Sequence, residues 1–77
     1  MFGKYRKAKK LIKEHGYVLR AAPTKETCYL LVSIQDNSIK TKFFRKDGQW
    51  HREGDENKLY PYPEIGALEV LDIDELL

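Results

Sequence analysis

The sequence predicts an α+β domain, in which an N-terminal amphipathic helix packs on an antiparallel β-meander of three to five strands. A C-terminal acidic segment, either a strand or a short helix, completes the predicted fold. Two observations carry this prediction. Apolar residues recur at helical spacing over residues 4–15, and short runs of β-forming residues separated by turn residues fill positions 27–52. A chain of 77 residues has room for one domain with a small core.

The helix over residues 4–15 has an apolar face and a basic remainder. Gly16 ends it, because helices commonly close on a residue with left-handed backbone conformation, which glycine adopts without strain. Residues 17–22 alternate between two sides and predict the first strand. Pro23 ends this strand, and residues 23–26 form a short turn. The apolar face of the helix consists of Tyr5, Ala8, Leu11, Ile12 and His15.

The second predicted strand, residues 27–34, is apolar on both faces. A strand of this kind is usually central and covered on both sides. We expect Leu30 and Val32 to face the helix, and the C-terminal segment to cover the opposite face. The predicted core consists of Leu11, Ile12, Leu19, Leu30 and Val32.

Two further strands are predicted to form a hairpin around Asp47 and Gly48. A two-residue turn of type I′ needs positive φ at both central positions, and Asp-Gly is a preferred pair for it. The polar residues 35–38 connect the second strand to the first arm, residues 39–45, and residues 49–52 form the second arm. Residues 54–58 are predicted to be a polar loop, and residues 60–63 an extended segment stiffened by proline.

The C-terminal residues 65–77 fit two descriptions. Apolar residues at positions 65, 68, 73 and 76 have helical spacing, whereas the β-branched Val70 and Ile73 favour a strand. We expect a strand over residues 67–71, with a short helical turn after Asp72.

Charge is distributed unevenly along the chain. Residues 1–20 contain seven Lys or Arg and one acid, whereas residues 64–77 contain five acids and no base, within a net charge of +2. This polarity fits an anionic partner at the basic end, or two ends that lie close together and neutralise each other. A single cysteine and the lack of a long apolar run favour a reducing, cytoplasmic environment without a membrane.

The sequence shows no pattern typical of catalysis or metal binding. His15 and His51 stand at a helix end and on a hairpin arm, without a Ser/His/Asp order, a phosphate loop or a Glu-x-x-His pattern near them. Together with Cys28 they lack the paired spacing of metal ligands, and Cys28 is interpreted as a small buried hydrophobic residue. We therefore expect a binding protein that is not an enzyme and uses no cofactor.

Residues 11–18, followed by strands, resemble the opening of the HicA-type toxins. These are small RNA-cleaving proteins with a helix packed on a three-stranded sheet, and they carry a Gly-Ser-His element on the strand after the first turn. Residues 24–28 of this chain occupy that place and contain no histidine. The resemblance therefore implies, at most, a toxin-like protein that lacks the expected histidine.

Cations and aromatic side chains are interleaved in the predicted hairpin. Single-stranded nucleic acid is held by cations along its phosphates and by rings that stack on its bases, and two-stranded ribbons also enter a duplex groove. The sequence thus favours a small module that binds nucleic acid through this hairpin and the basic helix. The predicted binding residues are Lys4, Arg6, Lys7, Lys40, Lys42, Phe44, Lys46, Trp50 and Arg52.

Two alternatives to nucleic-acid binding fit the same residues. Lysines on a strand oppose edge-to-edge aggregation, and Trp50 could cap the core, so the hairpin pattern has a purely structural explanation. The other alternative is a protein-binding adaptor or inhibitor, of the kind encoded by phages or mobile elements, that uses the aromatic strands and the acidic tail. The sequence leaves the partner and the oligomeric state open.

Overall fold

The computed structural model describes residues 2–22 and 27–73, with the backbone alone for residues 2–4. The predicted turn at 23–26 and the last four residues therefore lie outside the described residues. The five strands form one antiparallel sheet in the order β1-β2-β3-β4-β5, which confirms the predicted α+β meander. The elements are α1 (Phe2–Glu14), β1 (Tyr17–Ala21), β2 (Cys28–Ser33), β3 (Ile39–Lys46), β4 (Gln49–Arg52), β5 (Asp55–Tyr60) and α2 (Pro63–Val70).

Helix α1 has the amphipathic form that the sequence predicts. Ala8 and Ile12 are buried in the core, and Gly16 has a φ of 86° where the helix closes. The ring of His15 also belongs to this helix end, because its Nδ1 donates to the carbonyl of Leu11 at 2.8 Å. The same carbonyl also accepts the backbone N–H of His15 at 3.1 Å, so His15 is bonded to the last turn of α1 through both its backbone and its ring.

The hairpin of β3 and β4 confirms the prediction made from Asp47 and Gly48. Their φ angles are 54° and 76°, and Lys46 pairs with Gln49 across them. Positive φ at both central residues is the property of the type I′ turn. This turn fixes the register of the whole hairpin, so Phe44 lies opposite His51 and Phe43 opposite Arg52.

The predicted polar loop at 54–58 is wrong, because most of it belongs to β5. Arg52 pairs with Asp55 across Glu53 and Gly54, and Gly54 has a φ of 91°. Pairing is irregular between His51 and Arg52, and most of β5 is exposed. A polar edge strand without alternation gives no strand signal in the sequence, and β5 takes its conformation from pairing with β4.

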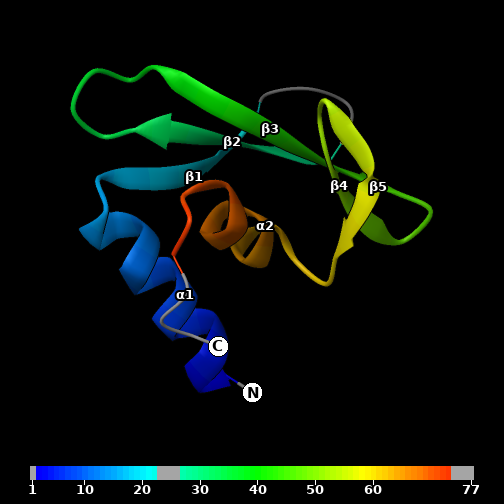
Figure 1. The fold of residues 1–77 in the computed structure, drawn as a ribbon, viewed down its shortest axis with the longest axis horizontal. Helices are drawn as coiled ribbons and strands as arrows, with labels where there is room; N and C mark the ends of the chain where they lie inside the picture. The colour runs from blue at the N-terminus through cyan, green and yellow to red at the C-terminus, as the bar shows by residue number, and fades with distance from the viewer. Residues whose placement is uncertain (1, 23–26, 74–77) are drawn as a thin grey trace.

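The favoured strand at 67–71 is also wrong, because residues 63–70 form α2. Pro63 occupies the first turn, where its missing N–H is not needed. Figure 1 shows α1 and α2 on the same side of the sheet, with no described element over the other side. The expected cover of the opposite face by the C-terminal segment is therefore not found among residues 63–73.

The core lies between the two helices and one face of the sheet. In β2 the residue that faces the helices is Leu31, which is fully buried, and not Leu30 as predicted. Leu30 is half-buried and points to the opposite side, since successive strand residues alternate. Val32 is buried as expected, but it lies between its neighbours Val18 and Ile39 on that opposite side. The core cluster consists of Ala8, Ile12, Leu31, Phe43, Trp50, Tyr60, Ala67, Leu68 and Ile73, with Leu11 and Leu19 partly buried against it.

Helix α2 is tied to the sheet by the carboxylate of Glu69. The hydroxyl of Tyr60 donates to it, and the ammonium of Lys58 and the guanidinium of Arg52 lie beside it. The hydrogen bond from Lys58, followed by that from Tyr60, lowers the pKa of Glu69. Burial, followed by the bond to Glu69, raises the pKa of Tyr60 to about 12. These polar contacts hold α2 against β4 and β5 on the covered face.

Candidate nucleic-acid interface

The face of the sheet opposite the helices is here termed the uncovered face. Directly paired residues of antiparallel strands point to the same side, so the pairings define two rows of side chains on it. One row runs across β1, β2 and β3, and the other across β2, β3, β4 and β5. The first row consists of Arg20, Leu30 and Lys42, and the second of Cys28, Phe44, His51 and Leu59.

Two aromatic rings stand side by side in the second row. The rings of Phe44 and His51 are stacked with centroids 5.4 Å apart and planes inclined by 14°. The His51 ring is held in place because its Nδ1 donates to the carbonyl of Glu56 at 3.0 Å. The two ring planes are therefore nearly parallel and face one another, and the hairpin register sets where the pair stands on the sheet.

Cations flank this aromatic pair. Lys46 is exposed near the end of β3, two residues after Phe44, and Arg20 is exposed on β1. Lys42 is half-buried, and its Nζ lies 3.6 Å from an oxygen of Glu53, a long contact between partly exposed groups that adds little stability. Beside Phe44 the surface has a shallow hollow of about 500 Å³, whose wall contains Lys42, Arg45 and Lys46 and also Glu53 and Glu56. The surface around the ring thus carries more cations than acids.

Lys40 occupies an irregular position in β3. Leu31 pairs with Thr41, and Val32 pairs with Ile39, so Lys40 is an extra residue between two paired ones. Such a β-bulge interrupts the alternation of side chains and bends the strand. The alternation that places Lys42, Phe44 and Lys46 on one face therefore does not extend to Lys40, although its side chain is exposed.

Trp50 and Arg52 lie on the covered face. Trp50 is 9% exposed and packs against the ring of Tyr29 with centroids 5.6 Å apart. Arg52 is half-buried, with its Nη2 2.9 Å from an oxygen of Asp55 and its Nη1 near Glu69. These two residues have structural partners, and the structure does not bring them to Phe44 and Lys46.

The cations of α1 are separated from the uncovered face by the sheet itself. Arg6 and Lys7 are exposed on the helix, which packs its apolar side against the covered face. Lys4 lies in the first turn of α1, and its side chain is outside the described part of the chain. The sequence predicts one interface formed by the helix and the hairpin. In the structure, α1 lies on the covered side of the sheet, and Phe44 and Lys46 of the hairpin lie on the other side (Figure 1).

Metal-binding and membrane-spanning features are not found among the described residues. No three of their His, Cys, Asp or Glu side chains form a group that could hold a metal ion, and neither described helix is long and apolar enough to cross a membrane. His15 is at the end of α1 and His51 on β4, and Cys28 is buried. The uncovered face and a cavity beside α1 are two of the places in the described part of the chain where polar groups gather.

Comparison of the chain with protein-family models, with curated proteins and with solved structures gave no match. The geometry of the uncovered face adds Arg20 and His51 to the predicted interface. Both were predictable from the sequence. Arg20 shares a strand face with Val18, two residues earlier, and the Asp-Gly turn places His51 opposite Phe44.

Proposed function

We propose that the protein is a small binding module that holds single-stranded nucleic acid on the uncovered face of its sheet. The observation that carries the proposal is the stacked pair of Phe44 and His51, which stands among the cations of an open sheet. A sheet with helices on one side and aromatic residues on the other is a recurrent platform for unstacked bases. The pair supplies ring surface for bases, and the flanking cations attract phosphates.

The two contributions differ in what they provide. Stacking of a base on an aromatic side chain stabilises a complex by roughly 1–3 kcal/mol and tolerates any base. Each contact between a cation and a phosphate strengthens binding at low salt, and it makes the affinity fall more steeply as salt is added. The proposed contacts are thus Phe44 and His51 with bases, and Arg20, Lys42 and Lys46 with phosphates. Trp50, Arg52 and the cations of α1 are not part of this interface.

The test is a titration of a labelled single-stranded oligonucleotide of about ten nucleotides, followed by fluorescence anisotropy. At about 50 mM salt we expect binding that weakens steeply as salt is added. Phe44→Ala should lower affinity by roughly 1–3 kcal/mol. Folding of each variant is checked first by circular dichroism.

A matched pair of charge reversals locates the interface. Lys46→Glu and Lys7→Glu change the net charge equally, but they lie on the uncovered face and on α1, respectively. We expect Lys46→Glu to weaken binding several-fold and to lower the salt slope, and Lys7→Glu to have a much smaller effect. Equal effects of the two variants would show that the uncovered face is not the interface.

A protein partner is the second candidate, because large aliphatic side chains are also exposed. Ile34, Ile39 and Leu59 are 47%, 60% and 52% exposed, and Leu59 belongs to the row of Phe44 and His51. Exposed apolar groups of this kind occur at protein interaction sites. Binding to an apolar surface would depend little on salt, so the salt titration separates the two candidates. No oligonucleotide binding at about 50 mM salt would favour the protein partner.

A further inference from the structure

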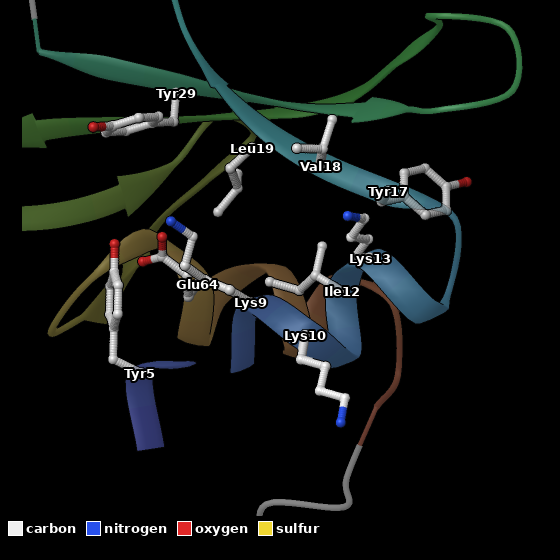
Figure 2. Close-up of a pocket in the computed structure, with 10 residues that line it drawn as sticks. All are labelled: Tyr5, Lys9, Lys10, Ile12, Lys13, Tyr17, Val18, Leu19, Tyr29 and Glu64. Carbon is white, nitrogen blue, oxygen red and sulfur yellow. The ribbon is translucent and has the colours of Figure 1, made fainter. Parts of the chain in front are cut away.

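A cavity of about 400 Å³ lies between α1 and the β1 side of the sheet. Most of its wall comes from the helices and from Tyr17, Leu19 and Tyr29 on the covered side of β1 and β2, and Val18 borders it at the edge of β1 (Figure 2). The cavity does not include Phe44, His51 or Lys46 of the uncovered face. Its volume is within the range of roughly 300–1,000 Å³ that is typical of sites for small molecules. The polar and aromatic residues in its wall include Tyr5, Tyr17, Tyr29, Lys9, Lys13 and Glu64.

The most unusual of these residues is Glu64, in the first turn of α2. It is only 5% exposed, and its Oε1 has no hydrogen-bond partner among the described residues. The carboxylate is hydrogen-bonded to the hydroxyl of Tyr5, whose pKa is raised by burial and then by the charge and hydrogen bond of Glu64. A buried acceptor without a donor destabilises the fold unless a ligand or a solvent molecule supplies one. The carboxylate is directed into the cavity (Figure 2), where a ligand N–H would satisfy it.

Aromatic rings flank the carboxylate. Tyr5 is held against Tyr62 with centroids 5.5 Å apart, and Tyr29 is held against Trp50. The ammonium of Lys9 lies 5.3 Å from the centroid of the Tyr5 ring. Figure 2 shows Glu64, Tyr5, Tyr29 and Lys9 at one end of the cavity.

The other end of the cavity is basic. Figure 2 shows Lys13 beside Tyr17, away from Glu64. Three lysines of α1 line the cavity, Lys9, Lys10 and Lys13, and all three are exposed. Figure 2 shows the side chain of Lys10 pointing away from the other two. A ligand that fits both ends has a planar group with N–H donors and, some distance from it, an anionic group.

We propose that this cavity binds a nucleoside monophosphate, with a guanine base beside Glu64 and the phosphate near Lys13. Guanine presents two adjacent donors, N1–H and the 2-amino group, which suit a carboxylate that lacks a donor. Its flat ring matches the walls formed by Tyr5 and Tyr29, and its phosphate matches the lysines. A simple ammonium ion would be opposed by the lysines, and inorganic phosphate would leave Glu64 without a donor.

Isothermal titration calorimetry with the full chain tests the choice of ligand. We expect GMP to bind, IMP to bind several-fold more weakly because it lacks the 2-amino group, and inorganic phosphate to give no saturable signal. Absence of GMP binding up to roughly 1 mM, the upper end of ordinary metabolite affinities, would overturn the proposal. Equal affinity for GMP and inorganic phosphate would overturn it as well.

Variants at the two ends of the cavity test the orientation of the ligand. Glu64→Gln should weaken GMP binding about tenfold and remove most of the preference for GMP over IMP. Because Glu64 is buried and its variant could unfold, the exposed Lys13 provides a second test. Lys13→Ala should weaken GMP binding several-fold without changing the affinity for guanosine, which has no phosphate. Lys7→Ala, on the same helix but outside the cavity, is the matched control and should bind GMP normally.

The same titrations show whether GMP binds in the cavity or on the uncovered face. Lys46→Glu, which should weaken oligonucleotide binding, is expected to leave GMP binding unchanged. If Lys46→Glu and Lys13→Ala weakened GMP binding equally, the nucleotide would not be bound in the cavity. Failure of oligonucleotide binding alone would leave the GMP result as an independent test.

Discussion

The two faces of the sheet contain apolar residues in comparable places but differ in what covers them. On one face Leu31, Phe43 and the helices exclude water, whereas on the other Leu30 and Phe44 are half-buried under no described element. The described residues contain two helices, and both lie on the same side. Within this part of the chain, β2 is apolar on both faces but has a covering layer on one face. The residues of the uncovered face are therefore candidates for binding.

The largest expected effect contrasts two adjacent leucines of β2. Leu31→Ala should lower the free energy of unfolding by roughly 2–5 kcal/mol, because Leu31 is fully buried and its removal leaves a cavity. Leu30→Ala should cost about 1 kcal/mol, because Leu30 is half-buried. Urea denaturation of both variants measures the contrast. Equal losses would mean that the second face is covered as well.

A smaller effect is expected where α2 meets the covered face. A Cβ added at Gly66 would lie 2.5 Å from Cε1 of Phe43, whose ring is fully buried and cannot move aside. Gly66→Ala should therefore destabilise the domain by roughly 1–3 kcal/mol, although alanine is the better helix former. Phe43→Leu in the same chain should recover part of that loss, which a double-mutant cycle measures. Independent, additive effects would show that the two residues are not in contact.

The smallest expected effect concerns the hydroxyl of Tyr60. Tyr60→Phe keeps the ring in the core but removes the hydrogen bond to Glu69, and should cost about 1 kcal/mol because that carboxylate is partly exposed. The folded-state pKa of Tyr60, about 12, is above its ordinary value of 10.0. A raised pKa stabilises the fold below pH 10 and loses this contribution as pH rises toward 12. Thermal melts over this range should therefore show a smaller alkaline loss in Tyr60→Phe than in the wild type.

Most of the fold was predictable where local chemistry decides the backbone. Gly16 and the pair Asp47 and Gly48 were predicted from the positive φ that a helix end and a tight hairpin require, and all three have it. Strand β5 was not predictable from alternation, because it is a polar edge strand that depends on β4. Helix α2 is buried on several sides, so it lacks an amphipathic pattern, but Pro63 followed by Glu64 is a start signal that favoured a helix.

Local turn chemistry also made part of the candidate interface predictable. The turn at Asp47 and Gly48 fixes which residues of the hairpin share a side, and this groups Phe44 with His51. The side to which each group points depends on where the helices pack, which is a tertiary property. Trp50 was therefore placed in the interface although it is in the core. The sequence does not mark Glu64 as a binding residue, because that role depends on its burial next to Tyr5 in the folded chain.

The most direct test of the uncovered face as the interface is a map of amide chemical shifts, recorded while a single-stranded oligonucleotide is added at about 50 mM salt. We expect the largest changes on the adjacent strands that carry Arg20, Lys42, Phe44 and His51, and small changes along α1 and α2. Changes concentrated at Arg6 and Lys7 on α1, or no changes at all, would contradict the assignment of nucleic-acid binding to this face.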